Sequence, residues 1–267
     1  MKNLKIKYGD WALITGASSG IGEEFAKVLA SRGINLVLVA RRKELLTNLS
    51  KELIDNYGIE VVISNVDLAS GNFLENIISD INGHEISILV NNAGIGKPGM
   101  FIEENITYEK NLLSINCVAP LILANYFANR MIKRKRGAII FIGSVVAYQP
   151  TPVMSSYAAT KAFILSLGNA LWYELRKYGI DVLTVHPGNT ATEFNRIILN
   201  NNSILTRKAS QVVKTSLKYL GRKPNVVDGV VNKIMTSISK HVKIRLITSI
   251  TGKLMLSFYK NNYLVNK

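Results

Sequence analysis

The segment Trp11–Gly22, WALITGASSGIG, constrains the fold of this chain more than any other. Its apolar start is typical of a buried strand, and from Glu23 the apolar residues recur at helical spacing. Between them, Gly16 suits a tight turn, while Gly20 and Gly22 let a ligand and the helix approach the backbone closely. The free amides at the start of the helix favour a phosphate or pyrophosphate. The glycines alone are equally consistent with a plain turn, since their spacing is not the common G-x-G-x-x-G.

The rest of the chain alternates apolar strand-like runs with amphipathic helical stretches. The runs cover residues 34–40, 61–66, 86–90, 138–142 and 181–185, and 226–227 is a short last strand. Helices are expected over residues 44–57, 73–81, 107–115, 117–133, 155–178, 191–200, 209–220, 230–239 and 246–258. This alternation predicts a doubly wound, parallel α/β sheet with helices on both faces, in which ligands lie beyond the carboxyl ends of the strands.

Composition and charge limit the kinds of partner. The 267 residues suit one domain, 1–267, and the single Cys117 excludes an internal disulfide, which fits a reducing compartment. No signal peptide is recognisable, and no apolar run approaches the roughly 20 residues that span a bilayer, so we expect a cytoplasmic protein. The net charge is +15, but no basic region is interleaved with aromatic residues, so we expect no nucleic-acid partner. We also expect no metal site.

The sequence does not decide what the basic C-terminal extension, residues 228–267, binds. Its two amphipathic helices suit packing against the domain or a second subunit. They also suit peripheral contact with an anionic membrane.

Two arginines follow the second predicted strand. In a dinucleotide-binding sheet this strand end meets the adenosine ribose, where an acidic residue suits NAD and an arginine suits the 2′-phosphate of NADP. Arg41 and Arg42 stand here without an acidic neighbour in the sequence, which favours NADP over NAD, unless they simply cap a surface loop. Asp67, after the third strand, either meets the adenine or caps the following helix.

Tyr157 and Lys161 lie four residues apart on the long helix and so share a face. A nearby ammonium favours the phenolate, so we expect Lys161 to lower the pKa of Tyr157. Tyr157 would then serve as an acid toward a carbonyl or as a base toward an alcohol. Ser144, at a strand end, would donate a second hydrogen bond to the same oxygen. Tyr-x-x-x-Lys alone is also common by chance on surface helices.

These motifs occur together and in one order over residues 8–228. They are Thr15–Gly22, Asp67, Asn91–Gly94, Asn116, Ser144, Tyr157, Lys161 and Pro187–Gly188. In this combination the chain resembles the short-chain dehydrogenase/reductase family, single-domain subclass. The resemblance implies a Rossmann sheet of seven strands and hydride transfer between a nicotinamide and a carbonyl or secondary alcohol.

The resemblance also implies residue roles. Asn116, Ser144, Tyr157 and Lys161 would form the catalytic tetrad. The cofactor would contact Gly16, Ser18, Ser19, Gly20, Ile21, Arg41, Arg42, Asp67, Leu68, Asn92, Ala93, Gly94, Tyr157, Lys161, Pro187, Gly188, Thr190 and Thr192. Thr190 stands where the family usually has valine. Residues 189–206 would form the substrate lid.

Within this family, the chain most resembles bacterial ketoacyl reductases and hydroxysteroid dehydrogenases. Their pocket positions would be Ser144, Val146, Tyr148, Met154 and Phe194, which are mostly apolar. We therefore expect NADPH, a hydrophobic substrate such as a steroid, bile acid or acyl chain, and a homodimer or homotetramer. The alternatives are a cofactor-binding regulator that has lost catalysis and a membrane-associated binding protein with little turnover.

Overall fold

The structure, a computed structural model, describes residues 4–195 and 206–261. A sheet of seven parallel strands runs through it in the order β3-β2-β1-β4-β5-β6-β9. The strands are β1 (Trp11–Thr15), β2 (Asn35–Val39), β3 (Val61–Ser64), β4 (Ile86–Asn91), β5 (Gly137–Ile142), β6 (Ile180–His186) and β9 (Asn225–Val227). This confirms the predicted doubly wound, Rossmann-type sheet. The order reverses between β1 and β4, so the crevice that binds ligands in such sheets lies beyond their carboxyl ends.

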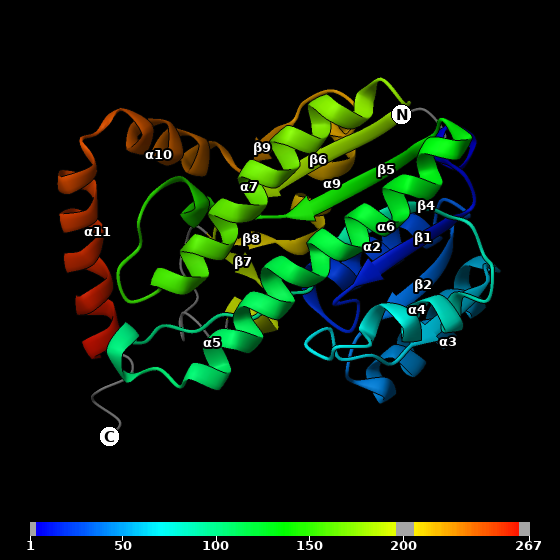
Figure 1. The fold of residues 1–267 in the computed structure, drawn as a ribbon, viewed down its shortest axis with the longest axis horizontal. Helices are drawn as coiled ribbons and strands as arrows, with labels where there is room; N and C mark the ends of the chain where they lie inside the picture. Colours follow the sequence, from blue (N-terminus) through cyan, green and yellow to red (C-terminus); the bar gives the residue numbers. More distant parts are fainter. Residues whose placement is uncertain (1–3, 196–205, 262–267) are drawn as a thin grey trace.

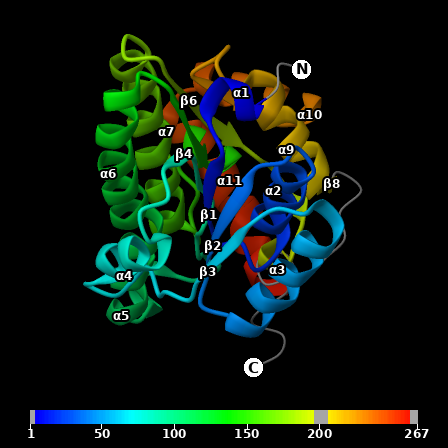
Figure 2. The same ribbon diagram turned by 90° about the vertical axis from the view of Figure 1, so that its right-hand side faces the viewer.

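Helices cover both faces of the sheet (Figures 1 and 2). One face carries α2 (Gly20–Ala30), α3 (Lys43–Tyr57) and α9 (Ala209–Tyr219). The other carries α4 (Phe73–Ile81), α6 (Ala119–Arg134) and α7 (Ser155–Arg176). Each face thus has its own apolar core, which explains why the central strands read as continuous apolar runs.

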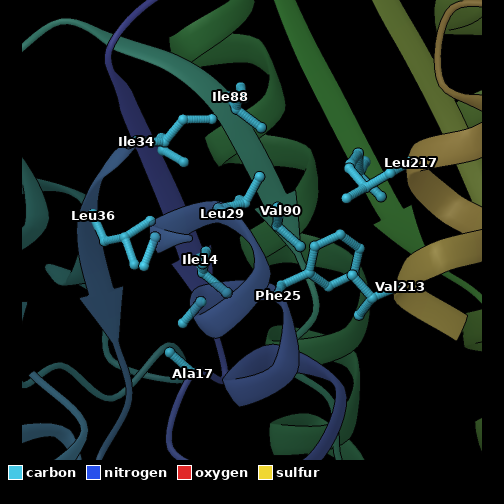
Figure 3. Packing of buried hydrophobic residues seen from close by; sticks show 14 of the residues in the cluster. Ile14, Ala17, Phe25, Leu29, Ile34, Leu36, Ile88, Val90, Val213 and Leu217 are labelled. Carbon is cyan, nitrogen blue, oxygen red and sulfur yellow. The ribbon is translucent and has the colours of Figure 1, made fainter. Parts of the chain in front are cut away.

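The core beneath α2 holds the glycine turn in place. Phe25 of α2 is fully buried between strand and helix residues, with Val90 of β4 and Val213 of α9 beside it (Figure 3). Ile14, the last apolar residue before the turn, belongs to the same cluster. Burial of this kind stabilises the folded state by roughly 2 kcal/mol per large side chain, so packed residues hold the turn in place both before and after it.

The helical region around Asn116 differs from its prediction. α5 (Ile106–Leu113) passes into a π-helical turn, Ser114–Val118, and then into α6 without a break. The expected division into two helices at Asn116 is therefore wrong. A π turn keeps the backbone hydrogen-bonded while it inserts an extra residue, and such turns are frequent at functional sites.

This continuous run, Ile106–Arg134, is the one helix in the described ranges that is long and apolar enough to cross a membrane. It corrects the expectation, made from uninterrupted apolar stretches, that no segment reaches such a length. Half of its most apolar window is buried inside the fold, as in the core helix of a soluble domain.

Several short elements were not predicted. They are α1 (Leu4–Tyr8), the single turns η1 (Phe101–Glu103) and η3 (Val145–Tyr148), and a small ribbon formed by β7 (Thr190–Ala191) and β8 (Arg207–Lys208). The helix expected over 191–200 begins instead after β7, and its remainder from residue 196 lies outside the described residues.

The two C-terminal helices form as predicted, as α10 (Val230–His241) and α11 (Ile244–Tyr259). In Figure 1 they stand beside the sheet rather than on either face. α11 packs on the loop that precedes α7. The Thr251 hydroxyl donates to the carbonyl of Pro150 at 3.2 Å, and a Cβ on Gly252 would lie 3.3 Å from Pro152.

Candidate active site

The glycine turn has the geometry that its sequence predicts. Gly16 and Gly20 adopt positive φ values of 65° and 62°, which favour glycine. A Cβ on Gly22 would lie 2.2 Å from the carbonyl oxygen of Gly16, so α2 packs directly on the turn. A hollow lined by Ser19, Gly20 and Thr192 adjoins the free amides at the start of α2. The free amides suit the pyrophosphate of a dinucleotide, while the side chains of Glu23, Glu24 and Glu193 also line the hollow.

Asn92 shapes the turn through hydrogen bonds within the protein. Its side-chain amide donates to the carbonyl oxygens of Thr15 and Gly16 at 2.9 and 3.1 Å. The Thr15 hydroxyl in turn accepts from the backbone amides of Asn92 and Ala93, both at 3.0 Å. Asn92 therefore ties the end of β4 to the end of β1, and any contact that it makes with adenine or ribose comes from the rest of its surface.

The two arginines lie beside carboxylates that come from distant parts of the chain. Arg42 binds the hydroxyls of Ser18 and Ser19, at 3.0 and 2.8 Å from Nη2, and both carboxylate oxygens of Glu193, at 2.9 and 2.7 Å from Nη1. Arg41 lies 4.0 Å from the carboxylate of Asp67. The Arg42 guanidinium thus lies against the glycine turn, and that of Arg41 lies beside Asp67. The sequence alone suggested a strand end without acids, whereas Asp67 and Glu193 both lie there.

Asp67 and Leu68 differ in environment. The Asp67 carboxylate accepts from the amide of Ala69 at 3.0 Å and so closes the turn after β3. Leu68 is buried. Neither the hydrogen bond of Asp67 nor the burial of Leu68 excludes an adenine beside these two residues. Their place beyond β3, next to Arg41, is consistent with the adenosine end of a dinucleotide.

The segment after β6 closes the opposite end of the crevice. The Val145 amide donates to the carbonyl of Pro187 at 3.0 Å, and a Cβ on Gly188 would meet Asn232 at 2.4 Å. Thr190 is buried, and its hydroxyl donates to the carbonyl of Gly188 at 3.1 Å, so threonine is accommodated in place of valine. The Thr192 side chain lies against Gly20, 2.9 Å from where a Cβ would be. The segment after β6 therefore contacts the glycine turn through Thr192.

Tyr157, Lys161 and Ser144 converge in the crevice. Both Tyr157 and Lys161 are buried on one face of α7, and Lys161 Nζ lies 5.6 Å from the Tyr157 ring centroid. Lys161 Nζ donates to the carbonyl of Ile142 at 2.9 Å, at the end of β5. Ser144 follows that strand and forms a hydrogen bond with the Tyr157 side chain. The geometry places the Tyr157 phenol, the Ser144 hydroxyl and the Lys161 ammonium together.

The pKa of Tyr157 shifts in the opposite direction from the expected lowering. Burial raises the pKa of the phenol above its ordinary value, and the hydrogen bond from Ser144 opposes that shift. Burial also lowers the pKa of Lys161 to about 8, since the ammonium is removed from water. Spacing on the helix brought the two groups together, but burial of the phenol, rather than the nearby ammonium, sets the direction of the Tyr157 pKa shift.

Asn116 binds the loop after β4 from within the π turn. Its amide group donates to the Ile95 carbonyl at 2.8 Å and to the Thr160 hydroxyl at 3.1 Å, and its oxygen accepts from the Ile95 amide at 2.9 Å. A Cβ on Gly94 would lie 3.3 Å from the Asn116 oxygen and 3.5 Å from Lys161 Nζ. A side chain at Gly94 would therefore contact both Asn116 and Lys161, two of the predicted tetrad residues.

The predicted apolar pocket forms in part. Met154 and Tyr157 make a buried cluster with Leu112, and Val146 and Phe194 pack against it. The Phe194 and Tyr157 ring centroids are 5.8 Å apart. Tyr148, by contrast, turns toward β6 and β9, where its ring meets His186 and its hydroxyl lies 3.2 Å from the Asn225 oxygen.

Several residues of the pocket, Leu112 among them, were not singled out from the sequence. Tyr108 and Lys97 line it together with Tyr157, and Lys97 Nζ lies 4.5 Å from the Tyr108 ring centroid. Burial, with the nearby Glu104 carboxylate, raises the pKa of Tyr108 to about 12. Met255 of α11 packs against the same cluster. Only the spacing of four between Tyr108 and Leu112 hinted at one shared face.

The residues present fit a nicotinamide dinucleotide. The glycine turn supplies a cradle for phosphate, the arginines flank the adenosine end, and Gly94 leaves space beside Lys161. Within residues 4–195 and 206–261, no group of three His, Cys, Asp or Glu side chains lies close enough to hold a metal ion.

Comparisons with known proteins agree with this geometry. The family model for short chain dehydrogenases matches residues 10–202. A very-long-chain 3-oxoacyl-CoA reductase of Phaeosphaeria nodorum is 38% identical over 223 residues, covering 80% of this chain and 64% of the relative. The chain therefore spans less than two thirds of that reductase.

Two solved structures are also similar. That of a 7beta-hydroxysteroid dehydrogenase has a TM-score of 0.88 at 25% identity, covering 94% of this chain and 99% of the other. That of a short-chain dehydrogenase from Sphingobium yanoikuyae in complex with NADPH has a TM-score of 0.75 at 36% identity, covering 82% and 87%.

Proposed function

Because the chain belongs to the short-chain dehydrogenase family, we propose that it is an oxidoreductase of CH–OH groups. It transfers hydride between NADP(H) and the carbonyl or secondary alcohol of a hydrophobic substrate. The convergence of Tyr157, Ser144 and Lys161 beside a glycine turn carries this proposal. The turn holds the cofactor, and the three side chains act on the substrate oxygen.

The Tyr157 hydroxyl is the proton donor in the reducing direction. When bound, the nicotinamide supplies the hydride. The phenol is protonated at neutral pH, because its ordinary pKa of about 10 is raised further by burial, so it has a proton to give to the developing oxyanion. The Ser144 hydroxyl donates a second hydrogen bond to that oxyanion, and two positioned donors stabilise its charge. Lys161, still largely protonated at pH 7, stabilises the phenolate that remains.

Asn116 positions the loop rather than the substrate. Its three hydrogen bonds to Ile95 and Thr160 fix the strand end where the cofactor lies. We also assign Asn116 a second role, which membership of the short-chain dehydrogenase family implies, in holding a water molecule of a proton relay.

The substrate is apolar beside its reacting carbon. Met154 and Leu112 form a buried apolar cluster with Tyr157, and Phe194 and Val146 pack against it. The related proteins named for 3-oxoacyl-CoA and for hydroxysteroids point to a long acyl chain or a steroid, including a bile acid.

NADP is the preferred cofactor because two guanidinium groups flank the adenosine end. The similar structure that holds NADPH supports this choice. Replacing Arg41 and Arg42 together by alanine should raise the KM for NADPH far more than that for NADH. An equal effect on both cofactors would mean that the arginines do not read the 2′-phosphate.

We further propose that the enzyme is a cytoplasmic homodimer or homotetramer. The expected substrate lid, residues 189–206, lies mostly outside the described residues, because 196–205 are not among them. The C-terminal helices bring the enzyme to an anionic membrane.

The experiment that tests the proposed function measures NADPH and NADH consumption against a panel of ketones. The panel holds keto bile acids, steroids, acetoacyl thioesters and small aromatic ketones, with Tyr157→Phe as the control. Turnover of one class that is lost in the variant supports the proposal and identifies the substrate. Tight NADPH binding without turnover of any ketone would instead favour a cofactor-binding regulator.

A further inference from the structure

α10 presents its apolar face outward. Its inner face is made of small polar residues, of which Thr236 and Ser239 are each 7% exposed. Its outer face carries large apolar side chains at helical spacing, among them Val231, Ile234 and Ile238, and Ile234 is 55% exposed. An ordinary surface helix of a soluble domain has the opposite arrangement. This face therefore suits an apolar medium or partner.

α11 continues the same pattern. Gly252 and Thr251 face the loop before α7, while Leu246, Ile250 and Leu254 form a stripe on the other side at spacings of four. Leu254 is 66% exposed. The two helices adjoin in sequence and stand together beside the sheet in Figure 1. We call these exposed side chains the C-terminal apolar face.

The charge around this face has one sign. The 39 residues after Asp228 contain seven lysines and arginines and no aspartate or glutamate. Lys233, Lys243, Arg245 and Lys253 are exposed on the two helices. Cations close to an anionic membrane strengthen binding to it. Two copies of the same face would instead bring like charges together, so charge favours an anionic surface over a second copy of this chain.

We infer that the C-terminal apolar face docks on an anionic lipid bilayer. The apolar side chains of α10 and α11 enter the boundary between headgroups and acyl chains, and the cations contact the anionic headgroups. This is binding to the membrane surface by amphipathic helices, and it needs no helix that crosses the bilayer.

Docking in this way brings the catalytic pocket to the lipid surface. Met255, on the inner side of α11, packs against the cluster that contains Tyr157, Met154 and Leu112. α11 thus stands between that cluster and the C-terminal apolar face, so a hydrophobic substrate dissolved in the bilayer lies one helix away from the pocket. This step rests on the proposed function, whereas the docking itself does not.

The test is co-sedimentation of the full chain with vesicles of phosphatidylcholine, alone or mixed with phosphatidylglycerol, at low and high salt. We expect pelleting that requires phosphatidylglycerol and weakens with salt. The double variant Ile234→Ser, Leu254→Ser should reduce the partition coefficient by on the order of tenfold or more. The matched control is Leu45→Ser, Ile54→Ser, which removes two exposed apolar side chains from α3 and should pellet like the wild type.

Wild-type protein that stays in solution with both kinds of vesicle would overturn the inference, as would equal pelleting of the two double variants. Dissociation of an oligomer by Ile234→Ser, Leu254→Ser, without any vesicle binding by the wild type, would assign the face to a subunit contact instead. Turnover of a water-soluble ketone is measured in parallel and should not change in this variant. Vesicle binding that persists when no ketone is turned over would overturn the proposed function and leave the docking intact.

Discussion

Replacing Gly96 by alanine would push a methyl group into the ring of Tyr157. A Cβ at this position would lie 2.6 Å from Cδ2 and 2.9 Å from Cε2 of that ring. The loop has little freedom to retreat, because its neighbour Ile95 is held by two hydrogen bonds to Asn116, at 2.8 and 2.9 Å. The Tyr157 ring must therefore move.

The size of this movement follows from the contact distance. Carbon atoms in ordinary contact are at least 3.4 Å apart, so the ring must shift by about 0.8 Å. A misplacement of about 1 Å in a catalytic group costs about 10²-fold in rate. We therefore expect Gly96→Ala to lower kcat by about 10²-fold while it changes the KM for NADPH much less.

The assay compares kcat and KM for the best ketone of the panel in wild type, Gly96→Ala and Gly99→Ala. Gly99 lies in the same loop, but its added Cβ would meet only the Glu104 carboxylate at an ordinary 3.4 Å. Thermal unfolding of all three proteins separates a displaced ring from a destabilised fold. If Gly96→Ala turns over as fast as Gly99→Ala, the loop yields instead of the ring and the reasoning is refuted.

Three further predictions concern charge. Glu193→Gln releases Arg42 from its bidentate partner and removes a negative charge from the adenosine end, so the KM for NADPH should fall several-fold relative to that for NADH in steady-state assays. Burial holds the pKa of Lys161 at about 8, below its ordinary 10.5, so the unfolded chain binds more protons between these pH values and stability should rise with pH there. Urea unfolding at several pH values checks this rise, and Lys161→Met should abolish it. Arg207→Met leaves the fully buried Asp228 without its ion-pair partner and should lower the free energy of unfolding by about 3–5 kcal/mol, whereas a loss below about 1 kcal/mol in urea unfolding would contradict a buried pair.

The elements that were predictable are those with a local signal. The strands were visible because residues buried on both faces of a parallel sheet form continuous apolar runs. The glycine turn was visible because positive φ and close packing require glycine at Gly16 and Gly22. The π turn at Asn116 was not predicted. A polar residue between two apolar helical stretches occurs both where a helix breaks and where it continues, so the sequence pattern does not separate the two cases.

The parts of the site that escaped prediction depend on contacts between distant residues. Arg42 and Glu193 are 151 positions apart, so the sequence around the strand end did not predict a carboxylate beside Arg42. Met255 reaches the Tyr157 cluster only because α11 folds back over the loop before α7. The pKa of Tyr157 likewise depends on its burial, which helix spacing does not reveal.

The measurement that tests the central claim most directly is the effect of Tyr157→Phe on two quantities, the kcat for the best ketone and the Kd for NADPH. The variant keeps the ring and loses only the hydroxyl that donates the proton. The account predicts that kcat falls by about 10²- to 10⁴-fold while the Kd for NADPH stays within about twofold. Undiminished kcat would contradict the assignment of Tyr157 as the proton donor.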